Sequence, residues 1–203
     1  MNYRADIDGL RAIAIVSVLL FHLDLAFFAG GFVGVDIFFV ISGFLITSLL
    51  RNELLTTGRI DLGSFYTRRF RRLLPALLVT LMATTCAAVL LLSPIYLERF
   101  GGALASAVLG LSNHYFWAEA DYFDLSAKIK PLLHTWSLSI EEQFYLIWPI
   151  TLSALFNSRL RRLIPYCLLL AAFISLSLNL IFGSGGGGLG INENNFINSF
   201  FFI

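Results

Sequence analysis

Five apolar runs divide this chain, each close to the roughly 20 residues that a helix needs to cross a bilayer. They cover residues 10–28, 33–50, 73–92, 139–156 and 164–182. Hydrophobic residues make up 58% of the sequence and charged residues only 13%, a composition too apolar for an ordinary soluble domain. The sequence therefore predicts an all-α fold, a polytopic bundle of transmembrane helices.

A sixth segment, 101–117, is less apolar and contains Gly101, Gly102, Gly110, Asn113 and His114. We expect it to be re-entrant, because irregular backbone is tolerated at membrane depth only where protein shields it. The alternative is a sixth full span. The sequence thus predicts five to six membrane segments.

Orientation follows from the basic residues after the second run, which are Arg51, Arg59, Arg68, Arg69, Arg71 and Arg72. Cytoplasmic loops carry an excess of Lys and Arg, so this connection and the amino terminus are predicted to be cytoplasmic. The loop after residue 156 is also basic, so an even number of crossings should separate the two. This favours a re-entrant 101–117 and an outward-facing region over 93–138.

The first run lacks a small-residue cleavage site, and we expect it to be retained as the first transmembrane helix. The chain ends in a new apolar run at 199–203, so we interpret residues 1–203 as the amino-terminal portion of a longer membrane domain. Cys86 and Cys167 lie in apolar runs, where a thiol behaves as a small hydrophobe. No metal site is predicted, and the glycine-rich stretch 183–190 is expected to be a flexible outward loop.

Arg11 and His22 lie at the two ends of an otherwise apolar stretch. They are eleven positions apart, almost three helical turns, so both point the same way with a rise of about 16 Å between them. Ionisable groups inside a span are costly and usually serve a site. The alternative is that Arg11 only anchors the helix by snorkelling and His22 sits near the outer interface without a role.

The basic run at 68–72 allows two compatible interpretations. It can be a signal that fixes topology, or an anion site in which arginine forks bind phosphate oxygens. Arg68 and Arg72 lie one turn apart on one face if this stretch is helical, with Arg69 between them.

The second run contains Asp36 and the pair Ser42-Gly43. Its glycines are expected mainly to let helices approach closely. Asp36 lies at the same predicted depth as His22, where it could orient or charge-compensate the imidazole.

A further cluster lies at 131–145. Ser139 and Glu142 have the spacing of a capping box, which gives Glu142 a structural explanation. Glu141 has none, and it shares a helical stripe with Tyr145 and Trp148. We interpret Trp136 and Trp148 as interface anchors. The remaining polar candidate in this cluster is His134, which closely precedes Glu141.

Several long motifs resemble the membrane-bound acyltransferase-3 family. They are Ile7 to Ala14, His22, Gly34 to Thr47, the arginines at 68–72, and His134 to Tyr145. The resemblance implies transfer of an acyl group, most often acetyl from acetyl-CoA, to a hydroxyl of a cell-envelope polysaccharide at the bacterial inner membrane. It also implies that Arg11 and His22 form the family's arginine-ten-residues-histidine motif, with His22 catalytic. Family members have about ten spans, so this chain corresponds to about half of one.

We therefore expect acetyl-CoA as a co-substrate, with no permanently bound cofactor, and its phosphates held by Arg11, Arg68, Arg69 and Arg72. His22 is predicted to take a proton from the acceptor hydroxyl, oriented by Asp36 or Glu141. An acyl-histidine intermediate is the mechanistic alternative.

Six further residues are predicted to be substrate-side or structural: Ser42, Gly43, His134, Trp136, Glu142 and Tyr145. The expected partners are membrane lipids and a polysaccharide or lipid-linked glycan acceptor, with no nucleic acid. The competing function classes are a glycolipid flippase that performs no covalent chemistry and a scaffold bundle. A scaffold has no need for two ionisable groups on one stripe of a membrane helix.

Overall fold

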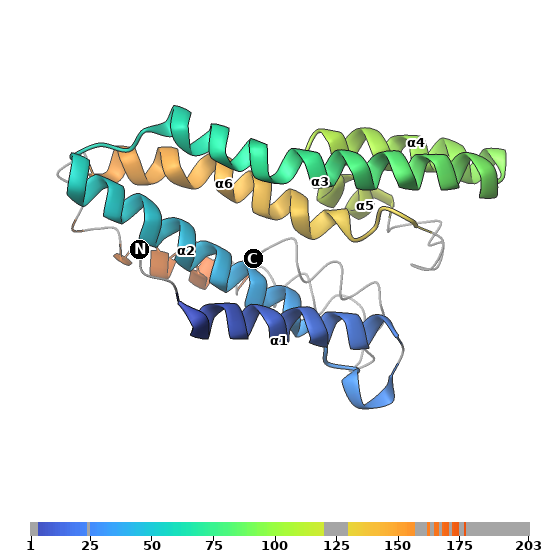
Figure 1. The fold of residues 1–203 in the computed structure, drawn as a ribbon, viewed down its shortest axis with the longest axis horizontal. Helices are drawn as coiled ribbons and strands as arrows, with labels where there is room; N and C mark the ends of the chain where they lie inside the picture. Colours follow the sequence, from blue (N-terminus) through green and yellow to red (C-terminus); the bar gives the residue numbers. More distant parts are fainter. Residues whose placement is uncertain are drawn as a thin grey trace.

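The computed structural model describes residues 4–23, 25–119 and 130–156, together with 162, 165, 166, 168–170, 172–174 and 177. Throughout residues 4–156, wherever the chain is described, its regular structure is helical, which confirms the all-α prediction. The elements are α1 (Ala5–His22), the 3-10 turn η1 (Ala26–Phe28), α2 (Val33–Thr57), α3 (Leu62–Leu91), α4 (Pro94–Val108), α5 (Ser112–Glu119) and α6 (Thr135–Phe156) (Figure 1). The predictions for 183–203 and for Cys167 lie outside the described residues, as do most of those for 157–182.

Among the helices that the structure describes, α2 and α3 are long and apolar enough to cross a membrane. Helix α1 begins at Ala5 and ends at His22, whereas the predicted run covers 10–28. Its first turns include Asp6 and Asp8, which makes this helix less apolar than the run read from the sequence. The number of spans beyond α2 and α3 stays a prediction.

The connection between α2 and α3 is much shorter than the sequence indicated. Helix α2 continues to Thr57 and ends at Gly58, whose φ of 76° is left-handed and suits glycine. Asp61 then caps α3 by accepting a hydrogen bond from the backbone N–H of Ser64 at 3.0 Å. The basic run at 68–72 therefore lies within the early turns of α3 and not in a loop.

Helices α1 and α2 pack closely through glycines, as the small residues of the second run predicted. A Cβ atom on Gly34 would lie 2.5 Å from the carbonyl oxygen of Ala14, and one on Gly31 would clash with the carbonyl oxygen of Ser17. Only glycine allows this approach of the two backbones. The pairing fixes where the α1 side chains lie relative to α2.

The segment 101–117 is not one continuous helix. Helix α4 covers its first part, the chain turns at Gly110 with a φ of 67°, and α5 follows. The two helices pack so tightly that a Cβ on Gly102 would meet the Tyr115 ring. The break at Gly110 means that no single helix runs through these residues, and whether the hairpin is re-entrant stays a prediction.

Polar side chains attach α5 to α6. The side-chain amide of Gln143 donates to the Asn113 side chain at 2.9 Å and to the Gly110 carbonyl at 2.8 Å. The Ser139 hydroxyl accepts from the backbone N–H of Ser112 at 3.1 Å. Helix α6 starts four residues before Ser139, so the predicted capping box of Ser139 and Glu142 is wrong.

Two hydrophobic clusters form the core. One joins α3, α4, α5 and the start of α6, and the other joins α2, α3 and the end of α6. Trp136 belongs to the first, where it is 8% exposed and meets Phe39 edge-to-face, so its interpretation as an interface anchor is wrong. Trp148 donates its indole N–H to Thr47 on α2 at 2.8 Å. Helix α2 thus packs against α1 and also against α6 (Figure 1).

Candidate active site

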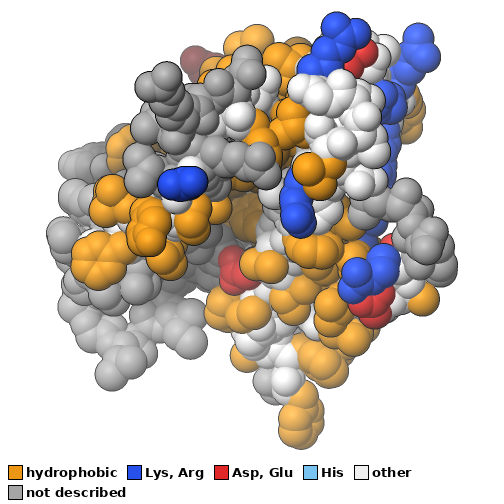
Figure 2. Space-filling view, turned by 90° about the vertical axis from the view of Figure 1, so that its left-hand side faces the viewer, with side chains coloured by type: hydrophobic (Ala, Val, Ile, Leu, Met, Phe, Trp, Pro, Cys, Tyr) orange, Lys and Arg blue, Asp and Glu red, His pale blue; other side chains and the backbone are white. Residues whose placement is uncertain are grey.

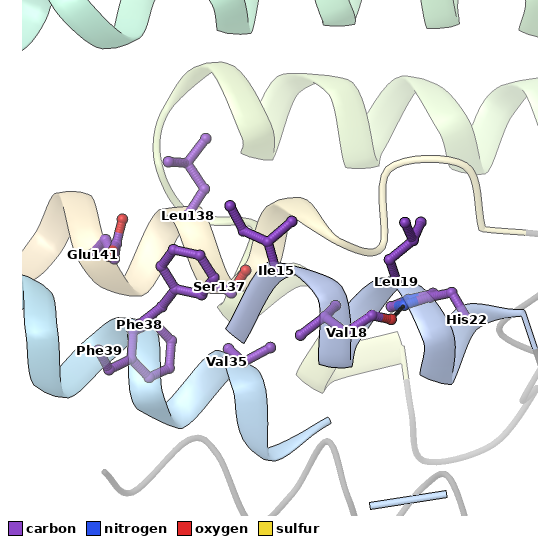
Figure 3. A pocket seen from close by; sticks show the side chains of 10 residues that line it. All are labelled: Ile15, Val18, Leu19, His22, Val35, Phe38, Phe39, Ser137, Leu138 and Glu141. Atoms are coloured by element: carbon purple, nitrogen blue, oxygen red, sulfur yellow. Dashed lines mark hydrogen bonds between the residues drawn. The ribbon is translucent and has the colours of Figure 1, made fainter. Parts of the chain in front are cut away.

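A cavity of about 450 Å³ lies between α1, α2 and α6. Figure 3 shows its lining, with His22 and Glu141 at opposite ends. The ten lining residues are Ile15, Val18, Leu19, His22, Val35, Phe38, Phe39, Ser137, Leu138 and Glu141. Seven of these side chains are apolar, so a ligand inside would meet a hydrocarbon wall with polar groups at only a few places.

His22 is the last residue of α1, and its imidazole is held by its own helix. Nδ1 lies 2.8 Å from the carbonyl oxygen of Val18, one turn earlier. Because a carbonyl oxygen can only accept, Nδ1 carries a proton, and in the neutral ring Nε2 then keeps a free lone pair. The ring is exposed and lines the cavity, so Nε2 can accept a proton from a bound molecule.

Glu141 marks the other end of the cavity. Arg69 and Arg11 both act electrostatically on its carboxylate, and the side chains of Ser42 and Tyr145 lie beside it. Arg11 is one turn before Ile15 on α1, and its guanidinium is also 3.9 Å from Asp8. The carboxylate therefore joins the apolar cavity to a group of cations.

Tyr145 and Arg69 are the centre of that group. The hydroxyls of Tyr145 and Ser42 share a hydrogen bond in a buried position between α6 and α2. The Cζ atom of Arg69 lies 4.9 Å from the centroid of the Tyr145 ring and 5.8 Å from that of Phe65, distances typical of cation–π contacts. Arg72 adds a further positive charge that acts on both Arg69 and Tyr145.

Of the four arginines predicted to hold phosphate, Arg69 stacks on Tyr145, and the charges of Arg11, Arg69 and Arg72 act on Glu141 or on Tyr145. Arg68 is exposed, and no described contact links it to this group. Figure 2 shows the face at the left-hand end of Figure 1, where α2 leads into α3. Most of the Lys and Arg side chains visible there lie on one side of this face.

Asp36 does not line the cavity that His22 lines, and among the described residues no contact joins the two. One of its carboxylate oxygens, Oδ1, is buried without a hydrogen-bond partner in the described structure. Its predicted role in orienting His22 has no geometric support here. The cavity lining leaves Glu141 as the carboxylate on the same cavity as the imidazole.

The other predicted residues lie around the site in different ways. His134 precedes α6. Burial lowers the pKa of its imidazole, and the charge of His22 lowers it further. Gly43 faces the Phe144 ring with room for a methyl group, since a Cβ there would lie 3.9 Å away. Glu142 packs against Gly110 and so belongs to the contact between the α4–α5 turn and α6.

Sequence reasoning missed three contributors. They are the Val18 carbonyl that fixes the imidazole, the aromatic wall of Phe38 and Phe39, and the stacking of Arg69 on Tyr145. The first two could have been found by following the helical stripes that contain His22 and Val35. The third joins residues far apart in the chain, and no periodic pattern points to it.

These features define a helical membrane protein with an apolar cavity that has a histidine at one end and a carboxylate at the other, and the charges of two arginines act on that carboxylate. The chain belongs to the acyltransferase-3 family, whose model of the acyltransferase domain matches residues 4–203.

Its relatives include the O-acetyltransferase OatA of Staphylococcus aureus strain NCTC 8325 / PS 47, with 41% identity over 181 residues, which are 89% of this chain and 30% of the relative. A putative O-acetyltransferase, SAS0844 of Staphylococcus aureus strain MSSA476, is 42% identical over 189 residues, 92% of this chain and 31% of the relative. The chain thus spans about a third of the length of these relatives. No solved structure matches it.

Proposed function

We propose that this chain provides the acyl-transfer site of an integral-membrane O-acyltransferase. The group transferred is acetyl, the donor is cytoplasmic acetyl-CoA, and the acceptor is a hydroxyl of a cell-envelope polysaccharide or lipid-linked glycan. The observation that carries this proposal is that one cavity has His22 at one end and, through Glu141, reaches Arg11 and Arg69 at the other. The O-acetyltransferase names of the relatives support the same chemistry.

The donor fits this arrangement in three parts. Its phosphates match the guanidinium groups of Arg11, Arg69 and Arg72, because arginine forks bind phosphate oxygens bidentately. Its uncharged pantetheine arm matches the apolar cavity wall. The thioester then lies near His22, since the rise along α1 from Arg11 to His22 is about 16 Å.

His22 acts as the general base in this mechanism. Nε2 takes the proton of the acceptor hydroxyl while the hydroxyl oxygen attacks the thioester carbonyl carbon. The tetrahedral intermediate collapses with cleavage of the carbon–sulfur bond, and the departing thiolate of coenzyme A takes the proton back from His22. Direct transfer and an acyl-histidine intermediate differ in one measurement: only the intermediate gives a burst of coenzyme A without an acceptor.

The membrane arrangement is part of the proposal. Helices α2 and α3 cross the bacterial inner membrane, and α1 and α6 join them in a multi-pass bundle. The amino terminus and the arginines of α3 are cytoplasmic, which places the donor site on the side where acyl-CoA occurs. The acceptor then approaches from the side of His22.

The test uses the complete gene product that contains this chain, expressed in bacterial membranes supplied with radiolabelled acetyl-CoA. We expect label in envelope polysaccharide from the parent and its loss from His22→Ala and Arg11→Ala at equal membrane levels. His114→Ala is the matched control, because His114 is exposed on α5 and does not line the cavity. Glycolipid movement without any transfer of label would overturn the proposal in favour of a flippase.

A further inference from the structure

Arg69 is the only one of the candidate phosphate-binding arginines for which the described structure shows an aromatic support. Its guanidinium lies over the Tyr145 ring at 4.9 Å and near the Phe65 ring at 5.8 Å. Both rings are buried, Tyr145 at 8% exposure and Phe65 at 2%. The cation therefore rests against a wall that belongs to the hydrophobic core shared by α2, α3 and α6.

The Tyr145 ring is itself fixed at its polar end. Its hydroxyl shares a hydrogen bond with the Ser42 hydroxyl, so Tyr145 on α6 is tied to α2 while its ring face carries Arg69 from α3. A ring held by core packing and by a buried hydrogen bond cannot turn away from the guanidinium. One side chain thus sets the relative positions of three helices at the arginine end of the cavity.

We propose that Tyr145 is a positioning residue that holds Arg69 ready for a phosphate group of the acyl donor. An arginine side chain has many rotamers, and ordering them on binding weakens affinity. Stacking uses only the face of the guanidinium and leaves its N–H donors, which lie in the plane, free to bind phosphate oxygens. The inference rests on the proposed function and deepens it, because it assigns Tyr145 to donor binding and not to the chemical step.

Two substitutions of Tyr145 separate the effect of its ring on coenzyme A binding from the effect of its hydroxyl. Tyr145→Leu removes the stacking surface, and we expect the Kd for coenzyme A to rise about three- to tenfold, the range of a partly buried cation–π contact. Tyr145→Phe keeps the ring and loses the hydrogen bonds that the hydroxyl makes with Ser42 and Glu141, so we expect a change of less than about twofold. In the turnover assay, Tyr145→Leu should raise the KM for acetyl-CoA and leave kcat nearly unchanged.

The matched control is Tyr66→Phe. The Tyr66 hydroxyl donates to the Leu146 carbonyl at 2.8 Å, so this variant also removes a hydrogen bond that joins α3 to α6, but it leaves the surface under Arg69 intact. We expect its Kd for coenzyme A to equal that of the parent. A rise like that of Tyr145→Leu would mean that any loosening of α3 against α6 weakens binding, and would overturn the specific role of Tyr145.

The experiment measures binding of unacylated coenzyme A to the complete protein in detergent by calorimetry. A parent that does not bind coenzyme A contradicts the proposed function itself. A parent that binds, with Tyr145→Leu binding equally well, overturns only the positioning role. A Tyr145→Phe variant that binds normally but loses kcat would place the hydroxyl in the chemistry and also overturn it.

A double-mutant cycle keeps the inference testable if the leucine variant is poorly folded. The folded fraction of each variant is first measured by its thermal unfolding. In an Arg69→Met background, the change from Tyr145 to Phe or Leu should no longer alter the Kd, because its effect passes through Arg69. Equal effects of Tyr145→Leu with and without Arg69 would show that the tyrosine acts independently and contradict the proposal.

Discussion

The imidazole of His22 donates a hydrogen bond from Nδ1 to the carbonyl oxygen of Val18, 2.8 Å away in the last turn of α1. Val18 lies four residues before the end of the helix, so the imidazole folds back over the last turn and bonds to the backbone of its own helix. The same bond selects the tautomer in which Nε2 accepts. The end of the helix therefore performs the orienting task that a second side chain often performs for a catalytic histidine.

Replacing His22 by alanine should lower the rate of acetyl transfer by about 10²- to 10⁴-fold, the usual contribution of a general base. Because the ring is exposed to the cavity, added imidazole should restore part of the rate. The measurement is turnover at saturating donor, with and without imidazole. An unchanged rate in His22→Ala would show that His22 only ends the helix and takes no part in the reaction.

Arg69→Ala should raise the KM for acetyl-CoA by about 10- to 100-fold, the range of a charge-assisted hydrogen bond to an anion. Arg68→Ala should raise it much less, since Arg68 is exposed and has no described contact with the group around Tyr145. Initial rates over a range of donor concentrations compare the two. Equal losses would indicate that the whole basic run attracts the donor as a diffuse charge.

Gly34→Ala should destabilise the protein by about 1–3 kcal/mol, because the new methyl group would lie 2.5 Å from the Ala14 carbonyl oxygen and must push α1 away. Gly9→Ala is the matched control on the same helix pair. Nothing lies within 4 Å of a Cβ at Gly9, and alanine favours a helix, so this variant should be as stable as the parent or slightly more stable. Thermal unfolding in detergent measures both, and equal stability of the two variants would contradict the close approach.

Gln143→Leu should cost about 1–3 kcal/mol, because it leaves the buried Asn113 side chain and the Gly110 carbonyl without their partner. Thr151→Val is the control, since the Thr151 hydroxyl bonds only within its own helix, to the Ile147 carbonyl at 3.0 Å. Limited proteolysis of the α4–α5 turn reports whether the hairpin has separated from α6. Unchanged protection in Gln143→Leu would show that apolar packing alone holds it.

The cap of α3 makes a pH-dependent contribution to stability. Hydrogen bonds from the Ser64 backbone N–H and from its hydroxyl lower the pKa of Asp61. The folded protein therefore binds fewer protons at this group than the unfolded chain. The stabilisation is complete above the ordinary pKa of an aspartate and is lost as the pH falls through the lowered folded value.

Thermal unfolding of the parent and of Asp61→Asn between pH 6 and pH 3 tests this cap. Asparagine keeps a capping oxygen but cannot titrate, so the variant should lose less stability on acidification. Identical slopes in the two proteins would show that other carboxylates account for the acid sensitivity.

Local periodicity could predict the parts of the site that lie on one helix. The spacing of Arg11 and His22 predicts that both lie on one stripe of α1, of which His22 lines the cavity, and the glycines before Asp36 indicate the close contact of α1 with α2. Helix ends were less predictable, because hydropathy measures apolar content and not backbone capping. Gly58 and Asp61 set the α2–α3 turn by conformation and hydrogen bonding, so the apolar runs ended several residues from the true helix ends.

Contacts between distant segments could not be predicted in the same way. The capping-box pattern at Ser139 was plausible in isolation, but tertiary packing extends α6 back to Thr135 and gives the Ser139 hydroxyl a partner on α5. Trp136 has the composition of an interface anchor, yet packing against Phe39 buries it. In each case a neighbour that is remote in the chain changes the role of a residue.

Helix α2 packs on α1 through Gly34, with Gly31 in the turn before the helix adding a second close approach, and it contacts α6 through Ser42 and Thr47. Helix α2 is therefore the common support of α1 and α6, and the cavity lies between these three helices. The width of the cavity therefore depends on how α1 and α6 are set against α2. Residues of α2 that never touch a substrate thus determine how large a group the cavity admits.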